Sequence, residues 1–407
     1  MAASRLRLQR LPLAIVAAFA VALCVASASA AASAAHTLPI IFFHGVTSNA
    51  KAGTNLRLNL ETPTRPFVAL NFCEDTCSVR DLPTQVNLAI AQIRSTVAND
   101  SRFDDGYVVI AHSQGGILAR AVLEEMDDHK AHTFISLAGA QNGNFYGPQP
   151  TDAVPTQVFL QRLGPKVLPK ELFNFANYTA EQVANGALQI DFLKLVNAQP
   201  ELQQKLSMAN LLRSPVQTDW ERFNKFMPTV NNMGPEVDED DAARRKENFL
   251  RLEAAHFFAS PADDVISPWQ TSILGKYKDV SSMEQLAKKF TTLTVVPMTK
   301  THEYSADTYG LKTLDKRGGL FLHTVDGVGH SCWVADSTPT GATQVCKFQP
   351  IFDEHLAPLI GATKAAASDS PRQSPTYNLH SRPATETWVG GVKVNRSQVA
   401  LSGHTAM

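Results

Sequence analysis

The segment A-H-S-Q-G-G, residues 111–116, joins a compact apolar run at residues 107–111 to a helical pattern at residues 118–126. A strand that turns sharply into a helix can present a serine at the carboxyl edge of a parallel sheet, and small neighbouring residues relieve the crowding of that turn. The usual pattern is G-x-S-x-G, in which Ala111 stands in place of the first glycine. The alternative is an ordinary turn in which Ser113 only caps the helix. The segment therefore favours a parallel sheet with Ser113 as the candidate nucleophile.

Other apolar runs repeat the alternation of strand and helix. Residues 38–43 and 67–72 are continuous apolar runs, a helical pattern follows at 86–97, and residues 133–137 form a further strand candidate. Continuous apolar runs are typical of strands that are buried on both faces. The sequence thus predicts an α/β fold with a mainly parallel central sheet and right-handed crossovers.

The pattern changes at about residues 141–246 to helical fragments rich in Leu, Phe, Asn and Gln, which predict an inserted, mostly helical cap. The strand pattern resumes at 249–258 and 320–325. We expect one catalytic domain at residues 33–361, followed by a poorly ordered tail at 362–407 that is rich in Ala, Ser, Thr and Pro.

Residues 1–32 combine three arginines, a short apolar run and A-x-A frames, a combination that predicts a cleaved signal peptide. The alternative is an uncleaved membrane anchor, although the run is short for a bilayer. No other stretch is long and apolar enough to span a membrane. We expect a mature protein in the secretory pathway, lysosomal or secreted, with glycan on at least one of the sequons at Asn99, Asn177 and Asn395.

The charge balance excludes a strongly basic nucleic-acid-binding surface. The 407 residues hold 37 Lys and Arg against 38 Asp and Glu, for a formal net charge of −1. Loss of Arg5, Arg7 and Arg10 with the signal peptide changes this charge to −4. We therefore predict no nucleic-acid partner.

The cysteines indicate disulfides rather than a metal site. Cys24 lies in the predicted signal peptide, and the other four form two close pairs, Cys73 with Cys77 and Cys332 with Cys346. In a secreted protein, local disulfides are the simplest of the three possible connectivities. The chain holds no H-E-x-x-H motif and no pair of C-x-x-C motifs, so we predict neither a metal nor a cofactor.

A nucleophilic serine needs a histidine base and a carboxylate that orients the base, in the chain order Ser, acid, His. His330 follows the apolar run at 320–325 in a loop with two glycines, and it completes this order. Asp263 and the rival Asp264 follow the earlier run at 249–258. His323 lies within the predicted strand and is a weaker candidate for the base.

Such a serine also needs two backbone N–H groups that bind the oxyanion. The residue after the nucleophile supplies one, which is Gln114 here, and the loop after an early strand supplies the other. That loop is His44-Gly45-Val46, in which we expect Val46 to donate and His44 to order the loop.

The motifs resemble those of the palmitoyl-protein thioesterases, lysosomal α/β-hydrolases that remove long-chain fatty acyl groups from Cys of S-acylated proteins. Most of the mature chain shares this likeness. The matching blocks are H-G-V at 44–46, S-Q-G-G at 113–116, L-A-R-A at 118–121, G-A-Q at 139–141, D-D-V-I-S-P at 263–268, Y-G-L-K-T-L-D at 309–315 and L-A-P-L-I-G at 356–361.

The resemblance implies an α/β-hydrolase fold, a serine thioesterase that needs no cofactor, and S-acylated proteins or peptides and fatty acyl thioesters as partners. It also aligns Asp263 with the family's acid. Two departures are Ala111 for the family's glycine and Thr47-Ser48 for its G-D, and the predicted cap matches weakly.

Two other functions remain open. The A-H-S-x-G-G elbow also resembles that of secreted bacterial lipases, so the first alternative is a lipase or carboxylesterase that acts on oxygen esters of lipids. The second is a non-catalytic binding protein of hydrolase fold. For a thioesterase, the cap should supply an apolar groove, with candidates Phe173, Phe175, Leu188, Phe192, Leu193 and Leu195.

Overall fold

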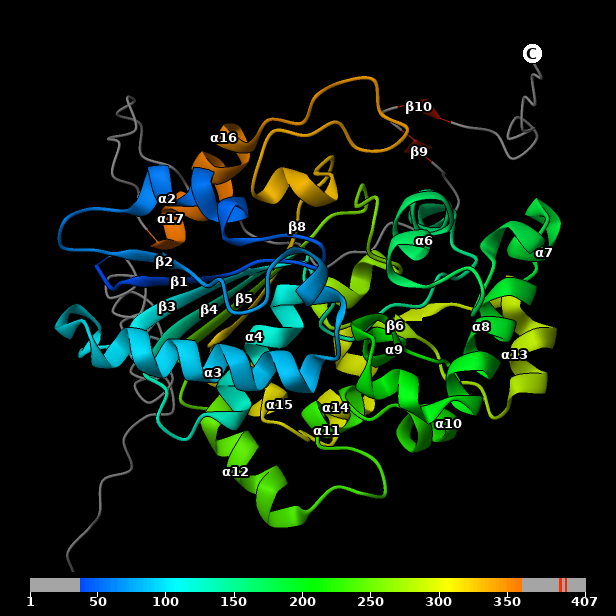
Figure 1. Ribbon diagram of the computed structural model, residues 1–407, viewed down its shortest axis with the longest axis horizontal. Helices are drawn as coiled ribbons and strands as arrows, with labels where there is room; N and C mark the ends of the chain where they lie inside the picture. Colours follow the sequence, from blue (N-terminus) through cyan, green and yellow to red (C-terminus); the bar gives the residue numbers. More distant parts are fainter. Residues whose placement is uncertain (1–36, 361–387, 390–391, 394–407) are drawn as a thin grey trace, which may run out of the picture.

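The computed structural model describes residues 37–360, 388–389 and 392–393. A six-stranded parallel sheet forms the centre of the molecule (Figure 1). Its strands are β1 (Ile40–Phe43), β2 (Phe67–Ala69), β3 (Tyr107–His112), β4 (Ala131–Leu137), β5 (Ala254–Ala259) and β8 (Leu320–Thr324). The spatial order is β2-β1-β3-β4-β5-β8. This arrangement confirms the predicted α/β-hydrolase fold class.

The strands form where the sequence is continuously apolar. All four residues of β1 and all six of β3 are buried, and the two strands pair in register from Ile40 with Val108 to Phe43 with Ala111. Because side chains leave a strand on alternate faces, both faces of this sheet must be covered.

Helices cover both faces of the sheet (Figure 1). One layer packs α3 (Leu82–Ala98), α4 (Gln114–Glu125), α12 (Glu239–Phe249) and α15 (Leu311–Lys316) into one apolar cluster. The opposite layer contains α2 (Thr54–Leu60), α16 (Phe348–Ile351) and α17 (Ala357–Ile360), the last two joined through a π-helical turn at Phe352–Leu356. The sheet is therefore the middle of three layers, as parallel strands require.

The chain between β4 and α12 is the mostly helical segment that we call the cap. It contributes to two apolar clusters outside the core layers, whereas its residues Trp220, Met227 and Val230 belong to the cluster that packs α3 and α4. Its helices are α5 (Ala153–Val158), α6 (Gly164–Val167), α7 (Ala180–Ala184), α8 (Ala187–Ala198), α9 (Ser207–Leu211), α10 (Gln217–Phe223) and α11 (Met227–Val230).

The predicted cap boundary near residue 246 falls inside α12, which belongs to the core layer. Phe249 at the end of α12 is fully buried in the same cluster as α4. A second excursion, between β5 and β8, adds β6 (Lys276–Tyr277), β7 (Val295–Val296) and α13 (Met283–Lys289) beside the cap, followed by α14 (His302–Ser305). Tyr277 and Leu286 from this excursion belong to the same apolar cluster as Leu193 of α8.

Both expected disulfides form, between Cys73 and Cys77 and between Cys332 and Cys346. Within the described residues no helix is long and apolar enough to cross a bilayer. The predicted signal peptide, Cys24 and the sequon at Asn395 lie outside the described residues. So does the predicted tail, apart from the antiparallel pair β9 (Trp388–Val389) and β10 (Val392–Lys393).

Candidate active site

Ser113 occupies the sharp turn between β3 and α4. Its φ of 58° lies in the left-handed region, which a non-glycine residue adopts at an energetic cost that is typical of functional turns. The backbone segments at this turn pack so closely that a side chain would not fit, since a Cβ on Gly115 would lie 2.6 Å from the carbonyl oxygen of His44. A Cβ on Gly45 would lie 2.8 Å from Ser113 Cβ. Gly45 and Gly115 are therefore required by space.

The structure brings the three predicted side chains together in one hydrogen-bonded chain. His330 begins a 3-10 turn after β8, and its Nε2 lies 2.9 Å from Ser113 Oγ. Its Nδ1 lies 3.0 Å from Asp263 Oδ2. All three residues are buried, with 6% or less of their surface exposed. This geometry lets a histidine accept the serine proton while a carboxylate orients the ring.

The two neighbouring carboxylates have different partners. Besides the ring of His330, Asp263 accepts hydrogen bonds from the backbone N–H groups of Val265 and Ile266. Asp264 instead accepts from the backbone N–H of His330 at 3.1 Å and from that of Thr340 at 2.8 Å. Asp263 thus contacts the imidazole, whereas Asp264 holds the loop that carries it. The sequence had left Asp264 as a rival acid and gave no signal for this second role.

The electrostatic environment favours a protonated His330. Burial alone would lower the pKa of the ring, but the charge of Asp263 and its hydrogen bond, with a further contribution from the charge of Asp264, raise the pKa above 6.5. A carboxylate that stabilises the imidazolium is what a general base needs when it takes a proton from serine.

Two further histidines lie in strands of the sheet, and their rings contact neighbouring protein groups rather than Ser113. His112 donates its Nε2–H to the carbonyl oxygen of His330 at 2.8 Å, and burial lowers the pKa of His112 to about 3, so its ring is neutral. His323 lies in β8 and stacks on Phe258, with ring centroids 4.1 Å apart. His323 is therefore packed within the sheet, in agreement with its lower ranking.

The two candidate oxyanion donors flank Ser113. Val46 and Gln114 both line the pocket into which Ser113 faces. Neither backbone N–H donates to another group in the part of the chain that the structure describes. Gln114 is also the first residue of the twelve-residue helix α4, where the helix dipole favours negative charge. His44 contacts the carbonyl oxygen of Gly45 through Nδ1 at 2.9 Å and stacks on Phe72, so it orders the loop as expected.

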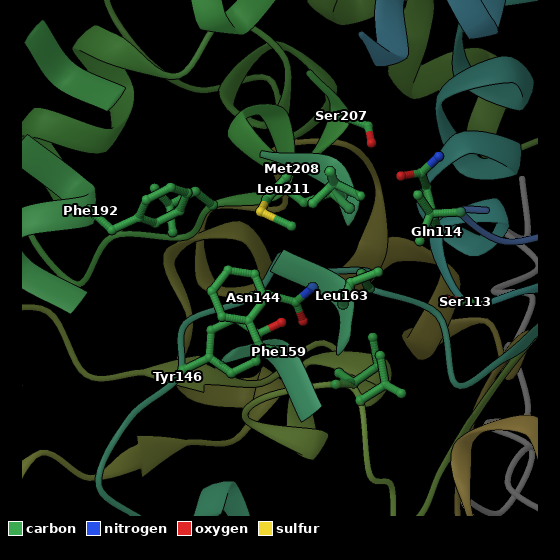
Figure 2. Close-up of a pocket in the computed structure, with 16 residues that line it drawn as sticks. Ser113, Gln114, Asn144, Tyr146, Phe159, Leu163, Phe192, Ser207, Met208 and Leu211 are labelled. Carbon is green, nitrogen blue, oxygen red and sulfur yellow. The ribbon is translucent and has the colours of Figure 1, made fainter. Parts of the chain in front are cut away.

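An apolar pocket extends from Ser113 into the cap and encloses about 580 Å³ of empty space, including space that is open to solvent (Figure 2). In this view Phe192 of α8 lies on the opposite side of the pocket from Ser113, with Met208 and Leu211 of α9 between them. The apolar and aromatic wall consists of Val46, Ala140, Tyr146, Phe159, Leu163, Val167, Phe192, Met208, Leu211, Leu212, Val265 and Ile266.

Only one of the six predicted groove residues, Phe192, lines this pocket. Phe173, Phe175 and Leu188 are buried in the cluster that forms the cap's interior, with Leu195 packed against it, and Leu193 is buried in the cluster beside α13. Asn144 and Ser207 line the pocket and were not predicted. Helical periodicity identifies buried positions, but it does not reveal which of them face a cavity.

Comparison with known proteins agrees with the resemblance found in the sequence motifs. A family model described as "Palmitoyl protein thioesterase" matches residues 39–330. The lysosomal thioesterase PPT2-B of Xenopus laevis is 27% identical over 303 residues, which are 74% of this chain and 88% of the relative. The human lysosomal thioesterase PPT2 is 28% identical over 303 residues, 74% of this chain and 84% of the relative. The Drosophila melanogaster homolog is 26% identical over 300 residues, with coverage of 72% and 86%.

Proposed function

Because this chain belongs to the palmitoyl protein thioesterase family, we propose that Ser113, His330 and Asp263 hydrolyse long-chain acyl thioesters of S-acylated proteins or peptides. The observation that carries this proposal is the hydrogen-bonded chain from Ser113 through His330 to Asp263 beside an apolar pocket. Thioesterase chemistry is the family's activity, and the assignment of roles to these three residues is our inference.

The first half of the reaction acylates Ser113. His330 Nε2 takes the proton of the Ser113 hydroxyl while Oγ attacks the thioester carbonyl carbon, and the carbonyl π electrons move onto oxygen. Asp263 keeps its own charge and stabilises the imidazolium. Collapse of the tetrahedral intermediate breaks the C–S bond, and His330 gives its proton to the leaving sulfur, which departs as a thiol.

The second half repeats these steps with water. His330 takes a proton from a water molecule that attacks the acyl-serine, and the Ser113 oxygen leaves with the proton that His330 returns. In both halves the N–H groups of Val46 and Gln114 bind the oxygen that becomes negative. Loss of one such donor in a serine hydrolase costs about 10²–10³ in kcat.

The apolar pocket supplies recognition of the acyl chain. Its wall combines aliphatic and aromatic side chains from the cap with Val265 and Ile266, which directly follow Asp263 and Asp264 in the chain. Burial of each CH₂ is worth about 0.8 kcal/mol, so two additional buried methylenes strengthen binding roughly 15-fold. We therefore expect kcat/KM to rise with acyl-chain length until the pocket is full.

We also propose that the protein follows the secretory pathway to the lysosome, as the names of its relatives suggest for them. Two disulfides and two exposed sequon asparagines, Asn99 and Asn177, support passage through an oxidising compartment. A shift in electrophoretic mobility after treatment with an N-glycosidase, lost in Asn99→Gln/Asn177→Gln, would support glycosylation at these positions. An unchanged wild-type mobility would contradict it.

The direct test compares hydrolysis of paired palmitoyl thioester and palmitoyl oxygen-ester substrates by the wild type and by Ser113→Ala. We expect a preference for the thioester that is lost in the variant. Faster cleavage of the oxygen ester, also lost in the variant, would indicate a lipase instead. Cleavage of neither ester by the wild type would contradict the enzymatic proposal and would favour a binding protein.

A further inference from the structure

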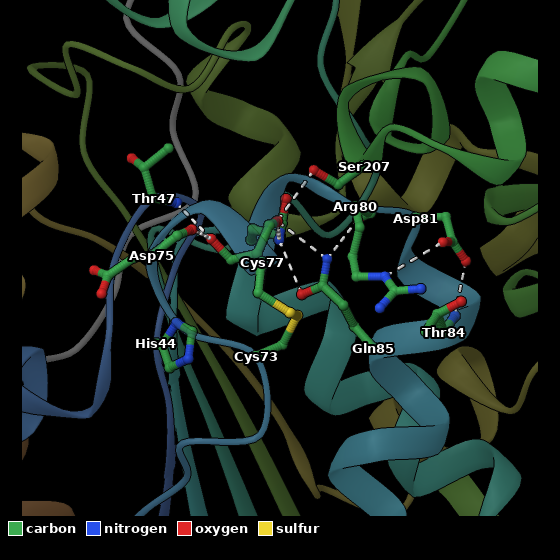
Figure 3. Close-up of a disulfide and its surroundings, with 12 residues drawn as sticks. His44, Thr47, Cys73, Asp75, Cys77, Arg80, Asp81, Thr84, Gln85 and Ser207 are labelled. Atoms are coloured by element: carbon green, nitrogen blue, oxygen red, sulfur yellow. Dashed lines mark hydrogen bonds and ion pairs between the residues drawn. A yellow bond between two sulfur atoms is a disulfide. The ribbon is translucent and has the colours of Figure 1, made fainter.

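A small disulfide-closed loop lies directly beside the proposed oxyanion hole. The disulfide joins Cys73 to Cys77, and a 3-10 turn spans Asp75–Val79. Ser78, the residue after the disulfide, is 1% exposed. Figure 3 shows the disulfide with Thr47 on one side and Gln85 and Ser207 on the other. None of these residues takes part in the proton transfers described above.

The disulfide loop holds the oxyanion segment that follows Val46. Four hydrogen bonds connect residues 47–50 to residues 74–78. Two of them join a backbone N–H to a side chain, one joins two backbone groups, and one joins two side chains. They are Thr47 N to Ser78 Oγ at 2.7 Å, Asp75 N to Ser48 O at 2.7 Å, Ala50 N to Glu74 Oε1 at 2.8 Å and Asn49 Nδ2 to Asp75 Oδ1 at 2.9 Å. Four consecutive residues after the donor Val46 are therefore fixed to one short loop.

Ser78 contacts the second half of the oxyanion hole as well. Its carbonyl oxygen accepts from Gln114 Nε2 at 2.8 Å, from Gln85 Nε2 of α3 at 3.0 Å and from Ser207 Oγ of the cap at 3.4 Å. Gln114 is the residue whose backbone N–H is the other proposed donor. Ser78 thus contacts the neighbour of one donor through its hydroxyl and the side chain of the other through its carbonyl.

We propose that Ser78 is a positioning residue for thioester hydrolysis, which fixes the backbone N–H groups of Val46 and Gln114 at the spacing that the oxyanion requires. This inference rests on the proposed function. The Ser78 hydroxyl accepts from Thr47 N–H and donates to the carbonyl oxygen of Asp75. Both of those backbone groups lose a partner when the hydroxyl is removed, so the turn relaxes at the point where Val46 must stay fixed.

The expected effect is on kcat. A donor that moves by about 1 Å can cost on the order of 10²-fold in rate, so we expect kcat of Ser78→Ala to fall roughly 10- to 100-fold. KM should change less than threefold, because the apolar wall that binds the acyl chain is untouched. Ser78→Thr keeps the hydroxyl and should recover most of the lost rate.

The matched control removes a buried serine hydroxyl elsewhere. Ser272 is 1% exposed, and its Oγ has no hydrogen-bond partner in the described part of the chain. Ser272→Ala should leave kcat and KM unchanged. A second probe, Gln114→Met, removes the amide that donates to Ser78 but keeps the backbone N–H. It should also lower kcat, and its effect combined with Ser78→Ala should be less than additive because both act on the same donors.

The rate at which an alkyl fluorophosphonate labels Ser113 gives a readout that does not depend on the natural substrate, since the phosphoryl oxygen also needs the oxyanion hole. We expect Ser78→Ala to be labelled roughly 10- to 100-fold more slowly than the wild type. Equal labelling and equal kcat would overturn the positioning role and leave the proposed function intact. Normal labelling of the wild type without thioester cleavage would overturn the proposed function, and the ratio of labelling rates would still test Ser78. A wild type that is not labelled would overturn both.

Discussion

The adjacent carboxylates Asp263 and Asp264 allow a sharp test of the site. Asp263→Asn removes the charge that faces the His330 ring, whereas Asp264→Asn alters a group that accepts only backbone N–H donors. The two substitutions are chemically identical and one residue apart. Any general effect of losing a carboxylate at this turn should therefore appear in both variants.

The magnitude follows from the contact between Asp263 and His330. Their closest atoms are 3.0 Å apart, so the two charge centres lie about 4 Å apart when the ring is protonated. At an effective dielectric constant of about 20 this attraction is about 4 kcal/mol, which corresponds to roughly 10³-fold in rate. We expect kcat of Asp263→Asn to fall by about this factor and that of Asp264→Asn to fall less than tenfold, since the asparagine keeps an acceptor oxygen.

The pH profile gives an independent readout. The neutral ring is the active base, so kcat/KM should rise with pH through the pKa of His330, which the wild type holds above 6.5. Without the charge of Asp263, the desolvation of the ring is less opposed and the pKa of His330 falls, so the acidic limb should move to lower pH. Stopped assays of thioester hydrolysis between about pH 4 and pH 9 would measure the pH profile of kcat/KM for both variants. The assignment of Asp263 as the orienting acid would be refuted if kcat fell as much in Asp264→Asn as in Asp263→Asn. It would also be refuted if the acidic limb of Asp263→Asn did not shift.

Gly45→Ala would place a methyl carbon 2.8 Å from Ser113 Cβ, so we expect kcat to fall at least about tenfold, and an unchanged kcat would contradict the required close approach. Met208→Trp should narrow the pocket, so kcat/KM for a palmitoyl thioester should fall roughly 10- to 100-fold more than for a butyryl thioester. Equal losses of kcat/KM for the palmitoyl and butyryl thioesters would show that Met208 does not line the acyl site. Replacing Cys332 and Cys346 by serine opens a loop of about 15 residues and should lower the free energy of unfolding by about 3 kcal/mol, as urea titration would measure. An unchanged midpoint would contradict this contribution.

Much of the sheet is predictable because a parallel strand with helices on both faces must be apolar along its length. Each of the six apolar runs overlaps a strand of the sheet, although their ends differ. The run at 67–72 yields only β2 (Phe67–Ala69), because the chain then leaves the sheet toward the disulfide loop at Cys73. The site was predictable for a related reason, since the fold fixes the chain order of Ser113, the acid and His330.

The cap was harder to predict because its helices are short. Helices of four or five residues, such as α6, α7 and α9, carry too little periodicity to be recognised, and they depend on tertiary packing for their stability. The acyl wall therefore differs from the predicted set, with only Phe192 in common. Ser78 could not be found from sequence, because a single serine in a polar stretch has no pattern. Its contacts join Thr47 and Gln114, which lie 31 and 36 positions away.

The most direct test is to trap the covalent intermediate. After brief mixing with a palmitoyl thioester and an acid quench, mass spectrometry of proteolytic peptides should find the palmitoyl group on the peptide that contains Ser113. Ser113→Ala should show neither the adduct nor turnover. Continued turnover by Ser113→Ala, or an acyl group on another residue that is kinetically competent, would contradict a mechanism that passes through Ser113.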